Sequence, residues 1–335
     1  MDEGSWTGRP TIVLLPILVS ALFPWFLEVR AGRLSQFRPV PVGRRTLPCP
    51  KSCSGDPIEV LFWARMRLRT LFWILLAILG TWGVLLAQKP FKQYPGGEDG
   101  NVPLPPDWQK PAEWVSARLR YRDAFGRRFR GFRSEGAWAT DYPLGDRHLI
   151  IGVQRLTRIN ARSVEQTVEL DGTDDIYNWP FLYAVEVGQW TLDETEGAQL
   201  REFLNRGGFL MVDDFHGLEQ WEIFVEGIRE AFPDGEIEDL QAADPIFHIL
   251  TDVDPKVQVA GLAALYRGRT WEQASDPYPR WRAIFDAKKR IVVAICHNMD
   301  LGDAWEHSDE PEYPADMAIV AHRALQNYAM YDLTH

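Results

Sequence analysis

Two short stretches of the chain concentrate side chains that can bind a cation or carry a proton. The first, 213–216 (DDFH), follows the apolar run 209–212, and the second, 297–307 (HNMDLGDAWEH), follows the apolar run 291–296. Neighbouring carboxylates bind divalent cations, and a carboxylate beside an imidazole can do acid–base work. The alternative interpretation is that these acids are solvated, or that they interact with the dipole of a following helix. The candidate ligand-binding residues are Asp141, Asp213, Asp214, His216, Asn298, Asp300, Asp303 and Glu306, and the candidate metal ligands are Asp213, Asp214 and Asp300.

No complete catalytic motif accompanies these candidates. The sequence has no G-x-S-x-G, no P-loop, no G-x-G-x-x-G after a strand and no H-E-x-x-H. No Ser or Cys follows Val212, where the nucleophile of an α/β enzyme would lie. Cys49 and Cys53 lack a second ligand pair, and Cys296 lies in an apolar run that predicts a buried structural thiol. The catalytic residues and the cofactor therefore stay unknown, and a divalent metal is the cofactor that the acidic stretches would suit.

The hydrophobic pattern predicts the elements that position these stretches. Strands are expected at 115–121, 180–185 and 209–212, and a hairpin at 281–296 that turns near 287–288. Helices are expected at 149–156, 218–231 and 316–331, and a capping box of Thr191 and Glu194 predicts a further helix that runs to Arg206 and stops at Gly207. This alternation indicates an α/β fold with a mostly parallel sheet and helices on both faces. Ligands of such sheets bind beyond the carboxyl ends of the strands, here after Val185 and Val212.

The charge of the chain is unevenly distributed. Its 335 residues are 46% hydrophobic and carry a net charge of −11, which is an ordinary globular composition. Residues 1–87 hold ten basic and five acidic side chains, whereas residues 88–335 hold 26 basic and 42 acidic ones. An acidic surface repels phosphate, so we expect no nucleic-acid partner. The basic, aromatic stretch 122–133 (RDAFGRRFRGFR) is interpreted as a twisted hairpin with solvated arginines, with contact to anionic lipid or glycan as the alternative.

The basic N-terminal part predicts membrane targeting. Residues 66–87 are a signal peptide cleaved after Ala87, or a retained membrane anchor. Residues 1–65 contain a second apolar run, 11–27, and form either a transmembrane segment or a misassigned extension before a true start at Met66. In the first case the basic loop 28–69 lies in the cytoplasm by the positive-inside rule. Both accounts place residues 88–335 on the outer, periplasmic side, either membrane-anchored or secreted.

The outer part divides into a linker and one domain. Residues 88–112 hold six prolines and three glycines, a composition that predicts an extended, solvated linker. Residues 113–335 form the α/β domain. The predicted organisation is therefore one or two N-terminal apolar helices, a linker and a single acidic domain.

Several segments of this domain resemble the bacterial family called domain of unknown function 4159. The likeness covers about residues 114–334 and implies a flavodoxin-like sheet, related to class I glutamine amidotransferase-like domains. It also implies partners among the MoxR-type ATPases and von Willebrand A-domain proteins of the cell envelope. It supplies no activity, and Asp213 and Asp214 stand where amidotransferase chemistry requires a cysteine. The segments are 138–143 (WATDYP) with Asp146, 156–159 (LTRI), 180–183 (PFLY), 207–214 (GGFLMVDD), 298–302 (NMDLG) and 305–306 (WE).

Two functions fit these observations. The first is a non-enzymatic envelope module that binds a partner protein or a small polar ligand at the acidic strand ends. The second is a metal-dependent hydrolase that acts on a polar envelope substrate, with the aspartates and His216 as ligands or acid–base groups. The hydrolase requires that Asp214 and Asp300 converge in one site. Whether the chain is an enzyme is left open by the sequence.

Overall fold

The computed structural model describes residues 66–76, 89–95, 102–124 and 136–335. The predictions for residues 1–65, for most of the 122–133 stretch and for the second half of the 66–87 segment lie outside these residues. Residues 66–76 form a helix with exposed side chains. The described helices include none whose length and apolar character would let it span a bilayer. The N-terminal apolar helices and the membrane location therefore stay predictions.

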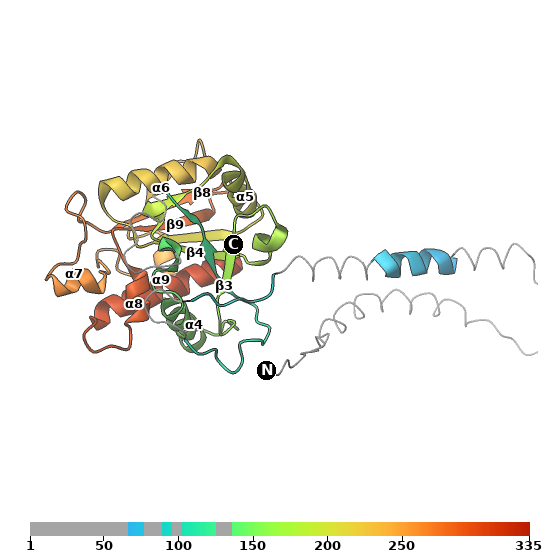
Figure 1. The fold of residues 1–335 in the computed structure, drawn as a ribbon, viewed down its shortest axis with the longest axis horizontal. Coiled ribbons are helices and arrows are strands. Elements are labelled where there is room, and N and C mark those ends of the chain that lie inside the picture. The colour runs from blue at the N-terminus through green and yellow to red at the C-terminus, as the bar shows by residue number, and fades with distance from the viewer. Residues whose placement is uncertain (1–65, 77–88, 96–101, 125–135) are drawn as a thin grey trace, which may run out of the picture. The chain divides into compact units, whose positions relative to one another are not determined.

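The centre of the domain is a seven-stranded sheet in the order β3-β1-β4-β6-β9-β8-β7 (Figure 1). The first five strands run parallel, and β8 and β7 extend the sheet at one edge through antiparallel pairings. The five parallel strands are β3 (Gln166–Glu169), β1 (Ser116–Arg120), β4 (Phe181–Val185), β6 (Phe209–Asp213) and β9 (Ile291–His297). The other two are β8 (Arg280–Phe285), which is antiparallel to β9, and β7 (Ile237–Asp239), which is antiparallel to β8. The short strands β2 (Arg122–Asp123) and β5 (Trp190–Thr191) form a separate pair.

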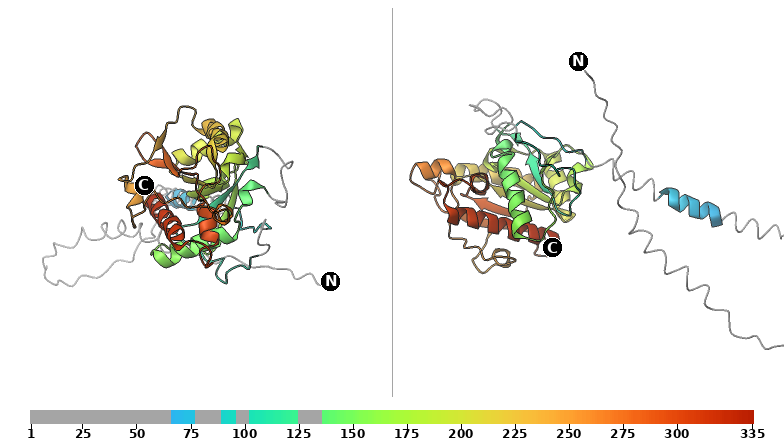
Figure 2. Two further views of the ribbon diagram at one scale, coloured as in Figure 1. Left: turned by 90° about the vertical axis from the view of Figure 1, so that its left-hand side faces the viewer. Right: turned by 90° about the horizontal axis from the view of Figure 1, so that it is seen from below.

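Helices cover both faces of this sheet (Figure 1, Figure 2). On one face lie α4 (Leu144–Leu156), α8 (Leu301–Glu306) and α9 (Ala315–Thr334), and on the other α5 (Glu194–Asn205) and α6 (Gly217–Ala231). A hydrophobic core lies on each face of the sheet, and alternate residues of a strand point into one core or the other. In β4, Phe181 and Tyr183 pack on the first face, and Leu182 and Ala184 pack on the second. The mixed α/β class and the two covered faces are thus confirmed. The remaining short elements are η2 (Ala137–Ala139), η3 (Asp174–Asn178), η4 (Val187–Gln189), η5 (Pro245–Phe247) and α7 (Leu262–Tyr266).

The start of α5 corrects the predicted capping box. The cap is Asp193, whose carboxylate accepts hydrogen bonds from Thr195 N and Glu196 N at 2.9 and 3.0 Å, while Glu196 reaches back to Asp193 N at 2.9 Å. Thr191 cannot serve as the cap because it is paired with Arg122 in the small sheet. The end of the helix is as predicted, since Gly207 follows it with a φ of 111°.

The described part of the linker contacts the domain, as Lys89 and Tyr94 show. The backbone N–H of Lys89 donates to Asp175 at 2.6 Å, and its ammonium group pairs with Asp171. The ring of Tyr94 packs edge-on against buried Trp138, at 5.6 Å between centroids. These two residues are therefore held against the domain, whereas a solvated linker was expected.

Candidate functional site

The carboxyl ends of β6 and β9 position the two acidic stretches side by side. The backbone N–H of Asp214 donates to Met299 O at 3.1 Å, and the N–H of Asn298 donates to Phe215 O at 3.0 Å. These bonds join the loop after β6 to the loop after β9. They fix the relative positions of the two polar stretches that were predicted at the strand ends.

Three buried carboxylates converge at this edge of the sheet. One carboxylate oxygen each of Asp141, Asp214 and Asp300 lies within 4.8 Å of the other two. Asp141 follows η2, Asp214 follows β6 and Asp300 caps α8, so three separate segments build the group. The residues are only 3%, 5% and 5% exposed. We call Asp141, Asp214 and Asp300 the aspartate triad.

Unusual backbone conformations aim these side chains. Asp141, Asp214 and Asn298 have φ values of 58°, 54° and 62°, in the left-handed region that non-glycine residues rarely adopt. Asn298 braces this geometry because its Oδ1 accepts from Gly217 N and its Nδ2 donates to Tyr278 O, both at 2.8 Å. Asn and Asp tolerate this region best, and such backbone strain clusters at functional sites.

Burial and mutual repulsion make the triad electrostatically costly. Burial raises the pKa of Asp214 well above its usual value, and the negative charges of Glu186 and Asp141 raise it further. Burial likewise raises the pKa of Asp300, with Asp214 and Asp303 adding to the effect. A cluster of this kind binds a proton or a cation in preference to standing fully ionised.

An imidazole and a further acid lie beside the triad. Nε2 of His216 is 3.0 Å from Asp214 Oδ1 and 4.0 Å from Glu272 Oε2. Burial, followed by the charge of His297, lowers the pKa of His216 to about 3, so the imidazole is neutral at physiological pH. Its buried Nδ1 has no hydrogen-bond partner among the described residues. Glu272, which sequence reasoning missed, is 30% exposed and sits on the solvent side of the group.

Asp213 and Asn298, two of the predicted site residues, hold the scaffold together and lie outside the triad. Asp213 Oδ2 accepts from the backbone N–H groups of Leu301 and Gly302 at 2.7 and 3.1 Å, which ties β6 to the first turn of α8. Burial raises the pKa of Asp213 to about 8, although these hydrogen bonds favour the ionised form. Asp141 takes the place in the triad that the sequence assigned to Asp213.

Comparison with known families identifies the domain that contains these strand ends. The family model described as Domain of unknown function (DUF4159) matches residues 116–333. The chain belongs to the DUF4159 family. A search among curated proteins found no match. The matched residues include the whole triad and both acidic stretches, so the site lies within the DUF4159 domain itself.

A second acidic group lies on α8 and its C-cap in the DUF4159 domain. Ligand atoms of Asp303, Glu306 and His307 also lie within 4.8 Å of one another. Asp303 Oδ2 accepts from Leu262 N at 2.6 Å, and His307 Nδ1 lies 2.8 Å from Glu310 Oε1. Asp303 and Glu306 were therefore predicted at the right end of the sheet, but they form a neighbouring group and not part of the triad.

Proposed function

We propose that the DUF4159 domain is a cation-dependent binding module of the bacterial cell envelope. A divalent cation held by Asp141, Asp214 and Asp300 completes the carboxyl edge of the sheet, which then binds a small polar ligand or a partner protein. The observation that carries the proposal is the convergence of three buried carboxylates from three separate segments. A cation supplies the positive charge that this arrangement calls for.

The donor set determines the kind of cation. Carboxylate oxygens are hard ligands that suit Ca²⁺, Mg²⁺ and Mn²⁺ better than softer metals. Oxygens spaced by up to 4.8 Å can share one ion, because ligands on opposite sides of Ca²⁺ lie about twice its 2.3–2.6 Å bond length apart. With Asp214 ionised, the N–H of His216 at Nε2 donates to it and orients it. Glu272 marks the side from which the ion would enter.

The strand order supports a flavodoxin-like fold for the module. Numbered along the chain, the five parallel strands follow the order 2-1-3-4-5 of that class, whose ligands bind at the carboxyl edge. The triad occupies that edge. An amidotransferase activity is not proposed, because Asp213 and Asp214 stand where the nucleophilic cysteine would be and Cys296 is fully buried.

The proposed location and partners rest on the sequence and the family resemblance. The basic, apolar start of the chain supports export or membrane anchoring, with residues 88–335 on the periplasmic side. The resemblance supports envelope proteins with MoxR-type ATPase or von Willebrand A domains as partners. The acidic domain supports a protein or small-molecule ligand over nucleic acid.

A thermal-shift series tests the proposal. The full-length chain in detergent is treated with EDTA and then titrated with Ca²⁺, Mg²⁺, Mn²⁺ or Zn²⁺. At a hundred times its Kd, one cation should stabilise the chain by about 2.7 kcal/mol, or roughly 5–10 °C. Asp300→Asn should abolish the shift while keeping the cap on α8, whereas exposed Asp309→Asn should leave it intact. A melt that no cation moves, or a shift that survives Asp300→Asn, would refute the cation site.

A metal-dependent hydrolase is the second candidate, and His216 is the observation that favours it. A neutral imidazole with an unpartnered nitrogen beside a cation could act as a general base. The two functions separate with His216→Gln, assayed by cation-induced stabilisation and by turnover of peptidoglycan fragments. A hydrolase loses turnover and keeps the cation, whereas the binding module shows no turnover in either chain.

A further inference from the structure

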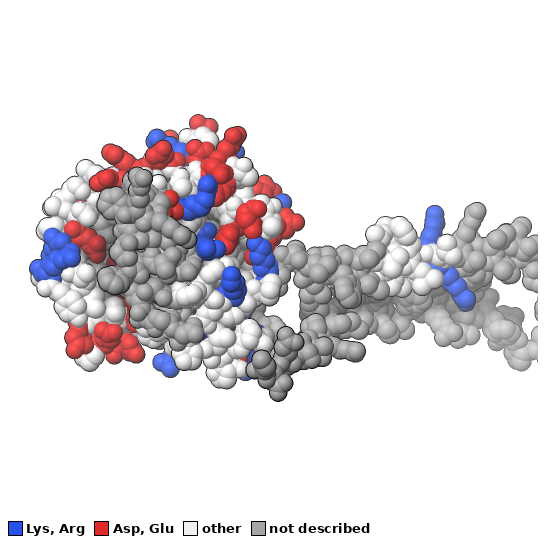
Figure 3. Space-filling model, in the orientation of Figure 1, with Lys and Arg blue, Asp and Glu red and all other residues white. Residues whose placement is uncertain are grey.

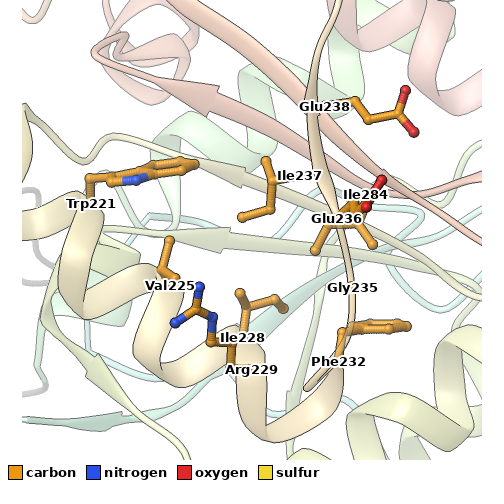
Figure 4. Close-up of a pocket in the computed structure, with 10 residues that line it drawn as sticks. All are labelled: Trp221, Val225, Ile228, Arg229, Phe232, Gly235, Glu236, Ile237, Glu238 and Ile284. Atoms are coloured by element: carbon orange, nitrogen blue, oxygen red, sulfur yellow. The ribbon is translucent and has the colours of Figure 1, made fainter.

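A groove lies at the antiparallel edge of the sheet, and none of its lining residues belongs to the triad. It has a volume of about 430 Å³ and runs between α6 and β7 (Figure 4). Its floor is apolar, with Val225 and Ile228 from α6, Ile237 from β7 and Ile284 from β8. Figure 4 shows the side chains of Val225 and Ile237 directed toward the space between helix and strand. The groove is thus an apolar strip alongside an edge strand.

The backbone of β7 is open on the groove side of the sheet. β7 is the last strand in the order and pairs with β8 alone. In an antiparallel pair, every second residue of a strand directs its N–H and C=O toward the neighbouring strand. Leu240 N donates to Trp281 O at 2.9 Å, so the backbone groups of Glu238, two residues earlier, also face β8. The N–H and C=O of Ile237 then face outward. An exposed edge of this kind is a template for one more strand.

The rim of the groove is strongly acidic. Glu236 precedes β7 and Glu238 lies within it, and the only basic residue of the groove lining is Arg229. Glu222, Glu226 and Glu230 of α6 line an adjoining pocket, which shares Trp221, Val225 and Arg229 with the groove. Lys289 lies 3.4 Å from Glu238 in an exposed pair. Figure 3 shows Asp and Glu side chains gathered along the upper side of the domain, where α6 lies in Figure 1. An occupant that matches this rim must carry positive charge.

We propose that this groove binds an extended, basic segment of a partner protein, which adds to the sheet beside β7. Main-chain hydrogen bonds to Ile237 hold the segment, and every second side chain, apolar, enters the strip between α6 and β7. The intervening Lys or Arg side chains lie beside Glu236 and Glu238, because opposite charges on neighbouring strands attract. A second copy of the chain is disfavoured as the occupant, since its own β7 edge carries the same acidic residues.

Fluorescence anisotropy with two labelled peptides tests this assignment. The probe is the peptide Lys-Ile-Arg-Val-Lys-Ile-Arg, and its acidic counterpart is Glu-Ile-Asp-Val-Glu-Ile-Asp. The full-length chain should bind the basic peptide and not the acidic one. The double variant Glu236→Lys/Glu238→Lys should weaken the basic peptide at least tenfold and bind the acidic one. The matched control Glu310→Lys/Glu312→Lys, which reverses two exposed charges elsewhere, should change binding less than twofold.

Three outcomes would overturn the assignment. One is the absence of binding at millimolar basic peptide. Another is equal weakening by the groove variant and the control variant, which would mean non-specific attraction to an acidic protein. The third is a dimer of the full-length chain in sedimentation that Glu238→Lys dissociates, because the occupant would then be a second copy. Peptide binding is measured both in EDTA and in Ca²⁺, so any effect of the cation is observed separately. None of these outcomes therefore bears on the proposed cation site.

Discussion

Two groups of buried charge in the same domain follow opposite rules. Beneath the sheet, Arg118 pairs with Asp146 at 2.6 Å, and both side chains are 0% exposed. Arg147 pairs with Glu165 at 2.6 Å close by. At the carboxyl edge, by contrast, Asp214 and Asp300 form no ion pair with any Lys or Arg among the described residues. One group is balanced by the chain's own side chains, whereas the other brings like charges together, for which we proposed an external cation.

The comparison shows that burial alone does not define a functional site. Structural ion pairs and ligand sites both hold charged groups away from water, and both perturb the pKa values of their members. They differ in what a neutralising substitution does. Removing one partner of a balanced pair leaves the other charge buried and unpaired, which destabilises the fold. Removing one member of a like-charged group relieves repulsion, which stabilises it. The sign of the stability change therefore distinguishes them.

The largest expected effect is on the balanced pair. Arg118→Met leaves the carboxylate of Asp146 buried without its partner and should destabilise the chain by about 3–5 kcal/mol. Urea denaturation measures the loss. Arg206→Met, which breaks an exposed pair with Glu202 at 55% and 50% side-chain exposure, is the control and should cost far less stability. The double variant Arg118→Met/Asp146→Leu should regain part of the loss, and a loss as large as in the single variant would contradict the ion-pair account.

A buried imidazole avoids the cost of burying a charge in a third way, because it stays neutral. Burial, and then the charge of His148, lowers the pKa of His322 to about 4. The unfolded chain binds a proton at this residue near pH 6.5 and the folded chain does not, so stability falls as the pH drops from 6.5 toward 4. The slope should reach about 1.4 kcal/mol per pH unit for this one group. His322→Gln should flatten this part of a stability–pH curve, and an unchanged slope would locate the effect elsewhere.

The sheet was largely predictable because its strands are short apolar runs. β4, β6 and the hairpin of β8 and β9 were predicted at nearly their observed positions, since buried strands carry little besides hydrophobic residues. The strands β3 and β7 were missed because QTVE and IED are polar at a sheet edge. The start of α5 was misplaced by a strand pairing of Thr191 with Arg122, which local sequence cannot reveal.

The sequence predicted where in the fold the site lies, but not which residues form the triad. Strand ends identified Asp214 and Asp300, and a family segment contained Asp141. Which of two adjacent aspartates faces the other carboxylates depends on the left-handed φ at Asp214, a tertiary property. Glu272 lies in a loop after no predicted strand, so nothing in its neighbourhood marked it.

The triad should respond to neutralisation with the opposite sign from Arg118. In EDTA at pH 8, Asp214→Asn removes one of three crowded carboxylates and should raise the stability of the chain by about 1–2 kcal/mol. In saturating Ca²⁺ the order reverses, because the variant has lost a ligand and gains nothing from the ion. Urea curves with and without Ca²⁺ give both numbers. If Asp214→Asn instead destabilised the chain in EDTA, the triad would behave like the balanced ion pairs, and mutual repulsion would not be its dominant feature.

The smallest effect tests the entrance to the triad. A Cβ on Gly261 would lie 2.6 Å from Asp300 Oδ2 and 2.8 Å from Glu272 Oε1, closer than either contact allows. Gly261→Ala should therefore displace these carboxylates and weaken cation binding about tenfold, or about 1.4 kcal/mol. The φ of −63° at this position suits alanine, so stability in EDTA should change by less than about 1 kcal/mol. Calorimetric titration with Ca²⁺ measures the affinity. An unaltered affinity would mean that the ion does not depend on Asp300 and that the triad is a structural group after all.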